Sequence, residues 1–139
     1  MKNFLVLALV ATLFSCSQNP KKMLTHLNGY WEISKAQMHD GLEKEYNFNA
    51  SIDYIMVNDS LKGFRKKLIP NIDGSYTMSQ DAEAVQIKIE NDSLNLYYKT
   101  QMSTWKETVL KATEDELMII NSRKDVYLYK RYQPLDLDL

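Results

Sequence analysis

The clearest structural signal in this chain is the stretch Ala84-Val85-Gln86-Ile87-Lys88-Ile89-Glu90. Successive side chains of a β-strand point to opposite faces, so this stretch places Val85, Ile87 and Ile89 on one face and polar residues on the other. The pattern is typical of a strand buried on one side. Residues 93–100 continue it, with leucine and tyrosine side chains on one face. The two runs therefore predict an antiparallel hairpin.

The same alternation extends outward in both directions, with turn residues recurring about every 8–12 positions. We expect about ten short strands, at residues 30–38, 43–48, 51–57, 61–69, 75–79, 84–90, 93–100, 104–111, 116–121 and 126–132. A short helical turn at residues 23–27 precedes them and ends at Asn28-Gly29. This pattern predicts an all-β fold, a small antiparallel up-and-down β-barrel of about 8–10 strands, because closure removes exposed strand edges.

The tetrapeptide Asn-Asp-Ser-Leu occurs twice, at residues 58–61 and 91–94. Asn and Asp tolerate positive φ and favour hairpin turns, so we expect both copies to connect strands. A duplicated half-barrel is the alternative interpretation.

The N-terminus has the features of an export signal. Lys2 precedes an apolar run at residues 4–14 that is too short to span a bilayer. The run ends in Leu13-Phe14-Ser15-Cys16, which resembles the bacterial lipoprotein signal. This resemblance implies cleavage before Cys16 and attachment of lipid (acyl chains such as palmitate) to that cysteine. The alternative is an ordinary secretory signal with a chance cysteine.

These features divide the chain into a signal peptide at residues 1–15, a lipidated tether at 16–23, a barrel at 24–133 and a tail at 134–139. Ser17 follows the cysteine, as in lipoproteins sorted to the outer membrane. We therefore expect a cell-envelope protein, anchored through its N-terminal lipid to the outer membrane and facing the periplasm.

Charge and cysteine content exclude several classes of partner and site. Lys2 is one of the 17 basic residues, so the mature chain has 16 basic against 18 acidic residues, a net charge of −2. This balance predicts no nucleic-acid partner, because phosphate binding needs a clear basic excess. Cys16 is the only cysteine, so no disulfide can form within the domain. The oligomeric state stays open.

The sequence offers no recognisable catalytic or metal-binding constellation. His26 and His39 have no cysteine or histidine neighbour at metal-ligand spacing, and we expect both to be solvated. No pair of carboxylates is placed together for acid–base chemistry, and four glycines provide no phosphate-binding loop. We expect no enzymatic activity, no metal and no cofactor.

Arg65-Lys66-Lys67 is the one basic run. Along a strand, Arg65 and Lys67 share one face and Lys66 takes the other. A solvated edge strand that uses charge to resist aggregation is one interpretation. Contact with an anion or a lipid headgroup is the alternative.

The stretch Leu27-Asn28-Gly29-Tyr30-Trp31-Glu32-Ile33 resembles the opening of the lipocalins, and of the lipocalin-like domains of many Bacteroidetes lipoproteins. In that family the tryptophan closes the barrel floor and a basic residue of the last strand lies across its indole. The resemblance implies a barrel-closing motif of Gly29, Trp31 and Arg131. A guanidinium stacks favourably on an indole face.

Two functions follow from such a barrel, depending on whether it holds a ligand or is packed solid. The first is binding of a small hydrophobic or amphipathic molecule, with large or soft strand residues lining the cavity: Tyr54, Met56, Leu96, Tyr98, Trp105 and Met118. The second is a filled barrel that acts as an envelope interaction module, with an exposed row of tyrosines such as Tyr127 and Tyr129 as its contact face.

Overall fold

The computed structural model describes residues 18–134, which fold into one short helix and nine strands. Residues 1–17, with the predicted signal peptide and Cys16, and residues 135–139 lie outside the described part of the chain. The elements are α2 (Pro20–Leu24), β1 (Gly29–Gln37), β2 (Glu43–Glu45), β3 (Ile52–Val57), β4 (Lys62–Pro70), β5 (Tyr76–Glu90), β6 (Ser93–Lys99), β7 (Thr104–Ala112), β8 (Glu116–Asn121) and β9 (Val126–Arg131). Within residues 18–134, no helix is long and apolar enough to cross a bilayer.

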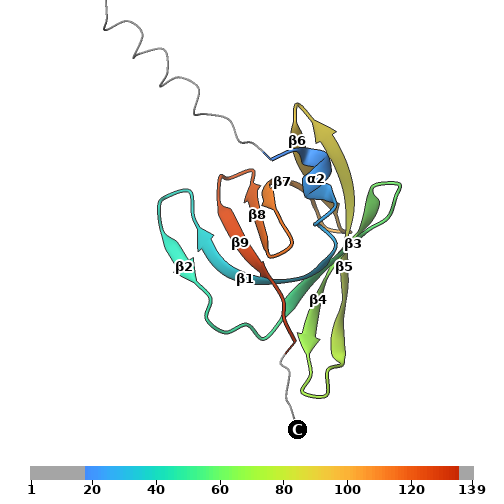
Figure 1. The fold of residues 1–139 in the computed structure, drawn as a ribbon, viewed down its shortest axis with the longest axis vertical. Helices are drawn as coiled ribbons and strands as arrows, with labels where there is room; N and C mark the ends of the chain where they lie inside the picture. The colour runs from blue at the N-terminus through green and yellow to red at the C-terminus, as the bar shows by residue number, and fades with distance from the viewer. Residues whose placement is uncertain (1–17, 135–139) are drawn as a thin grey trace, which may run out of the picture.

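Eight of the strands form a closed antiparallel barrel (Figure 1). From β3 to β9 each strand pairs with the next along the chain, β1 pairs with β3, and pairing of β1 with β9 closes the ring. The small strand β2 pairs with the far end of β1 and stands outside this ring. The predicted all-β, up-and-down barrel with a short N-terminal helix is thus confirmed.

Two of the predicted boundaries are wrong. Residues 75–79 and 84–90 are parts of the single 15-residue strand β5. The polar stretch between them was expected to be a loop, but it continues the ladder because Glu83 pairs with Arg65 of β4. The helix also begins earlier than residue 23, so part of the expected tether, residues 20–23, is helical. Asn19 caps it by accepting a hydrogen bond from the Lys21 backbone N–H, and Pro20 occupies the first turn.

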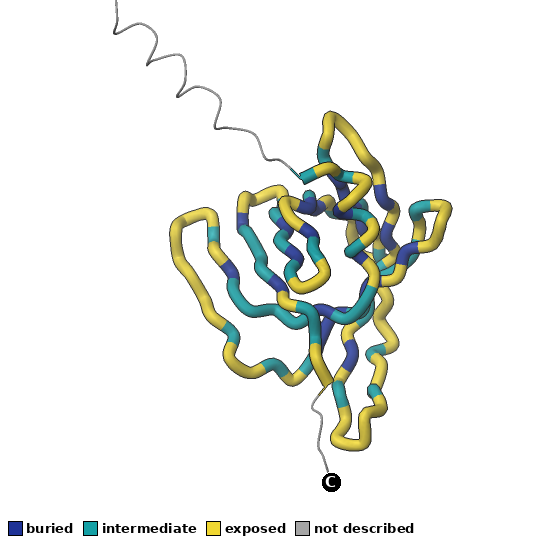
Figure 2. The backbone as a smooth tube through the Cα atoms, in the orientation of Figure 1, coloured by how far each residue is buried: buried dark blue, intermediate teal, exposed yellow. Residues whose placement is uncertain are grey.

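The two ends of the barrel differ in how they are filled. At one end, here called the floor, α2 packs beside β6 and β7, and Met23, Leu27 and Trp31 are buried. Figure 2 shows the buried positions in dark blue along the strands, whereas the connecting loops are exposed. Above them the interior is packed by apolar side chains around a cavity of only about 10 Å³. Such a void holds one water at most. The lower barrel is therefore a solid core.

Candidate functional site

The floor is closed by Trp31 of β1 and Arg131 of β9, which pair across the seam of the barrel. Trp31 is fully buried, and its indole N–H donates to the Leu27 carbonyl at 2.9 Å. The Arg131 guanidinium lies 3.7 Å from the centroid of the Trp31 ring. This is the stacking that the lipocalin resemblance implied. A cation at this distance gains from the ring quadrupole.

Arg131 also ties together segments that are distant in the chain. Its guanidinium donates to the carbonyls of His26 and Asn28, both at 2.9 Å, and to that of Glu114 at 2.7 Å. It thus joins the entry to β1 to the turn between β7 and β8. Burial lowers the pKa of Arg131. Gly29 makes room for this arrangement: its φ is +133°, and a Cβ there would strike Nη1 of Arg131.

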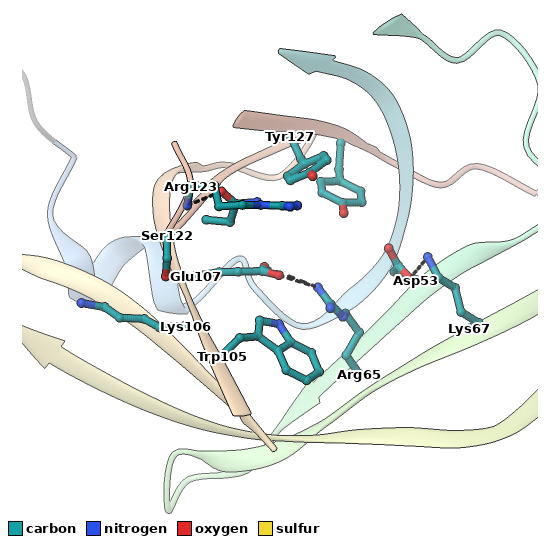
Figure 3. A pocket seen from close by; sticks show the side chains of 11 residues that line it. Asp53, Arg65, Lys67, Trp105, Lys106, Glu107, Ser122, Arg123 and Tyr127 are labelled. Atoms are coloured by element: carbon teal, nitrogen blue, oxygen red, sulfur yellow. Dashed lines mark hydrogen bonds and ion pairs between the residues drawn. The ribbon is translucent and has the colours of Figure 1, made fainter. Parts of the chain in front are cut away.

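The opposite end, here called the mouth, is open and holds a cavity of about 430 Å³. This volume is within the range of small-molecule sites. Figure 3 shows its side chains converging from several strands. They come from β3, β4, β7, β9 and the turn between β8 and β9, and include Asp53, Arg65, Lys67, Trp105, Glu107, Arg123, Tyr127 and Tyr129.

Arg65 lies at the base of the mouth, between two carboxylates. Its Nε is 2.6 Å from Oε2 of Glu83, whereas its Nη1 is 3.4 Å from both carboxylate oxygens of Glu107. The guanidinium carbon is 4.3 Å from the centroid of the Tyr98 ring. Burial alone would lower the pKa of Arg65, but the neighbouring phenol and carboxylates raise it above its ordinary value. Arg65 is therefore a fixed cation inside the barrel.

Three side chains near Arg65 have pKa values that are raised by burial. Burial raises the pKa of Glu107, although Arg65 opposes that shift. Burial also raises the pKa values of Tyr98 and Tyr129, so both phenols stay neutral. These groups give the mouth a polar and partly desolvated base.

Two further ion pairs shape the rim of the mouth. Nζ of Lys67 lies 2.6 Å from Oδ1 of Asp53, whose side chain is buried. Asp125 is buried beneath the turn between β8 and β9, and its Oδ1 accepts from the backbone N–H of His39 at 2.9 Å and lies 2.9 Å from the Nδ1 of the His39 ring. Asn121 donates to its other oxygen at 3.1 Å. These hydrogen bonds lower the pKa of Asp125 to about 2, and the bond from the His39 backbone makes the largest contribution.

The structure separates the six expected ligand-lining residues into three groups. Tyr54, Met56 and Met118 are on the outer face, so their assignment to the interior is wrong. Tyr54 stacks on Tyr30 outside the barrel, Met56 is 39% exposed, and Met118 alternates with the buried Leu117 and Ile119.

Leu96 and Tyr98 do point inward, but they are buried in the solid core. Of the six residues, Trp105 is the one that lines the mouth, where it stacks on Tyr98 at 5.3 Å between ring centroids. The six residues were expected to line a cavity because their side chains are large or soft, and the face of the strand on which each one lies was not considered. Side chains alternate between the two faces of β3, and Asp53 and Ile55 share the inner face. The alternation therefore places Tyr54 and Met56 on the outer face.

The expected exposed row of Tyr127 and Tyr129 is also wrong. Both tyrosines line the mouth from β9, and Tyr129 is only 8% exposed. Arg65 and Lys67 share one face as expected, but that face is the interior, and β4 is not an edge strand because it pairs with β3 and β5. Glu107 and Asp53 were missed because a charged residue on the inner face of a strand reads like a solvated one.

His39 contacts Asp125 rather than being solely solvated. Within residues 18–134, no cluster of three histidine or acidic side chains is arranged to hold a metal ion.

Comparisons with known proteins agree with this architecture. A family model described as "Lipocalin-like domain" matches residues 27–119, a range that includes Gly29 and Trp31 but ends before Arg131. The crystal structure of a lipocalin-like protein from Bacteroides uniformis ATCC 8492 aligns with a TM-score of 0.51 at 11% identity, covering 77% of this chain and 99% of that chain.

A second crystal structure, of an uncharacterized protein from Bacteroides eggerthii DSM 20697, aligns with a TM-score of 0.49 at 14% identity, covering 76% of this chain and 99% of that one. A comparison with curated proteins finds no match.

Proposed function

This chain belongs to the lipocalin-like domain family, and on that premise we propose that it is a lipid-anchored protein of the cell envelope that binds a small amphipathic molecule at the mouth of its barrel. The observation that carries the proposal is the open cavity of about 430 Å³ above a solid core. A ligand of this protein occupies the mouth and does not thread deep into the barrel.

The lining of the mouth favours an amphipathic ligand over a purely apolar one. Trp105 and Tyr127 offer aromatic surface, while Arg65 and Glu107 place charged groups at the base. An entirely apolar ligand would cover those charges without pairing them, which is costly. A molecule with one flat apolar part and one polar part satisfies both kinds of surface.

The position of the N-terminal segment gives this proposal an orientation. The side-chain amide of Gln18 exchanges two hydrogen bonds with the backbone of Ala112, at the floor end of β7. Cys16 is two residues away, and two extended residues span at most about 7 Å. A lipid on Cys16 would therefore hold the floor against the outer membrane and leave the mouth facing the periplasm.

The test is binding of two fluorescent probes, the uncharged naphthalene ketone prodan and the fatty acid dansylundecanoate, to the mature domain. We expect saturable binding in the micromolar range with quenching of Trp105 emission. Tyr127→Ala, at the mouth, should weaken binding about tenfold, because an aromatic contact of roughly 1–1.5 kcal/mol is removed. Tyr97→Ala, at a half-buried tyrosine of the outer wall, is the matched control. Absence of saturable binding of both probes would refute the proposal.

Because the core is solid, a filled barrel that acts as a protein-interaction module is the second candidate function. A specific observation favours it: the β4–β5 hairpin carries exposed apolar side chains at Ile69, Ile72 and Met78, which are 49%, 92% and 57% exposed. If neither probe binds, this hairpin becomes the first surface to test. Ile72→Ser together with Met78→Ser should then abolish association with an envelope partner while leaving the melting temperature unchanged.

A further inference from the structure

Arg65 has hydrogen-bonding capacity that the protein itself does not use. A guanidinium has five N–H donors. Nε is held by Glu83, and Nη1 reaches Glu107 only through long contacts. Within residues 18–134, Nη2 donates to no acceptor, and it is not among the sealed polar atoms, so solvent reaches it. The edge of the guanidinium formed by Nη1 and Nη2 is therefore open to the mouth.

The contact between Arg65 and Glu107 is weak by its geometry. Charge-assisted N–H···O bonds are usually 2.7–2.9 Å long. The bond to Glu83 is slightly shorter than this range at 2.6 Å, whereas both contacts to Glu107 are well beyond it at 3.4 Å. An incoming oxyanion that makes two short bonds to the open edge would gain more than the Glu107 contact loses.

The charged side chains around the mouth are mostly paired. Four cations line it, Arg65, Lys67, Lys106 and Arg123, against the two anions Asp53 and Glu107. The chain as a whole has a net charge of −1. Asp53 is occupied by Lys67, Nε of Arg123 lies 3.5 Å from Oδ2 of Asp125, and Nε of Arg65 is held by Glu83. The feature that an anion can reach is therefore the open edge of the Arg65 guanidinium, and not a surplus of free cations.

We propose that the ligand of the mouth carries an oxyanion, a carboxylate or a phosphate monoester, which binds the Nη1–Nη2 edge of Arg65 in place of Glu107. This inference rests on the proposed function and names the chemical class of its ligand. The bidentate geometry of a guanidinium suits both anions. The apolar part of the ligand then lies between Trp105 and Tyr127, toward the opening.

The first experiment measures displacement of bound prodan by two molecules that differ only in their polar group, 2-naphthoate and 2-naphthylmethanol. We expect 2-naphthoate to bind at least about tenfold more tightly, the effect of one charge-assisted pair. Equal affinities would overturn this inference while the proposed function stands. If neither prodan nor dansylundecanoate binds, the proposed function itself falls.

Variants at the base of the mouth separate an anion site from a structural ion pair. Glu107→Gln removes the competing carboxylate and should tighten 2-naphthoate binding about fivefold, with no gain for 2-naphthylmethanol. Arg65→Gln should abolish the preference for the anion. Should Arg65→Gln fail to fold, the gain in Glu107→Gln still decides. Lys88→Gln makes the same charge change on the outer wall and should leave the preference intact. Loss of 2-naphthoate affinity in Glu107→Gln would overturn the proposal.

A third arm distinguishes the two oxyanions. 2-Naphthyl phosphate and 2-naphthoate carry their anion at the same ring position, so in competition for the site the tighter of the two identifies the head group. Either order supports an oxyanion site, provided that Arg65→Gln weakens both anions. Tight binding of either anion that Arg65→Gln leaves unchanged would place the site elsewhere and overturn the proposal.

Discussion

Arg131 and Gly29 show how two residues at opposite ends of the chain form one interaction at the floor. The guanidinium covers Trp31 and binds carbonyls on both sides of the seam. A Cβ at position 29 would overlap Nη1 of Arg131, so the absence of a side chain there leaves room for the guanidinium. In the Gly-x-Trp motif, the tryptophan therefore provides the ring on which Arg131 stacks, and the glycine leaves room for the guanidinium.

A double-mutant cycle tests this coupling. Gly29→Ala should destabilise the domain by about 3 kcal/mol or more, because it adds a steric clash with Arg131 to the strain of a positive φ. In an Arg131→Ala background the clash is gone, so the cost of Gly29→Ala should fall to the backbone strain alone. Urea denaturation measures both differences.

Gly74→Ala provides the matched control for this cycle. Gly74 also has a positive φ, of +83°, but a Cβ there would meet nothing within 4 Å. Its substitution should cost about 1 kcal/mol in either background. Strictly additive effects of Gly29→Ala and Arg131→Ala would contradict the assigned contact.

At the scale of elements, turns define the two ends of the barrel. The tetrapeptide Asn-Asp-Ser-Leu forms two different turns. At residues 58–61 all four residues make the loop and Leu61 takes the positive φ, of 60°. At residues 91–94 the loop is Asn91-Asp92, with φ values of 49° and 61°, and Ser93 and Leu94 begin β6. The copies share their chemistry but not their structure, which argues against a duplicated half-barrel.

The contacts of Asp125 with the backbone N–H and the ring of His39, here called the Asp125–His39 clasp, join two turns at the rim of the mouth. They also make the stability of the fold depend on pH. The folded state lowers the pKa of Asp125 from 3.8 to about 2, so folding favours the carboxylate. Its contribution to stability is complete above about pH 5 and is lost as the pH falls through 4 toward 2.

Asp125→Asn should therefore lower the free energy of unfolding at pH 7 and flatten its decline between pH 5 and 2. Denaturant titrations across this range measure the effect. Asp59→Asn, an exposed aspartate of the turn between β3 and β4, should leave the decline as in the wild type. An Asp125→Asn protein with the wild-type acid profile would show that the clasp does not couple folding to protonation.

At the scale of the whole molecule, the floor and the mouth lie at opposite ends of the barrel, and the chain reaches the floor first. Gln18 is bound at the floor beside β7, close in sequence to Cys16. An anchor at this end would keep the proposed ligand site clear of the bilayer. In the proposed location, the polar lining of the mouth suits exchange with water better than lateral entry from lipid.

The anchor itself is tested with Cys16→Ser. The variant precursor should remain uncleaved and unlipidated, because the substituted serine offers no thiol for acylation. Mature wild-type protein should partition into the detergent phase of Triton X-114 and carry the mass of the acyl groups. A Ser17→Ala protein should behave like the wild type. Detergent partitioning and lipid mass in the Cys16→Ser protein equal to those of the wild type would sink the lipoprotein assignment.

The sequence alone determined the architecture, because a barrel strand carries its own signature. Val85, Ile87 and Ile89 alternate with polar residues, and turn residues separate such runs, so local pattern is enough to predict an up-and-down barrel. The contact at the floor could also be predicted from the sequence, through the resemblance of Gly29, Trp31 and Arg131 to the lipocalin motif. These residues lie on the two strands that meet at the seam.

Only the tertiary structure decided what the interior contains. Arg65, Glu107 and Glu83 come from three different strands, and no local pattern shows that their side chains meet inside the barrel. Alternation reports two faces but does not report which polar residues face inward, because a charge can be buried where a partner from a distant strand neutralises it. For the same reason the sequence could suggest a ligand cavity among Leu96 and Tyr98, whereas packing filled that region and left the open site at the mouth.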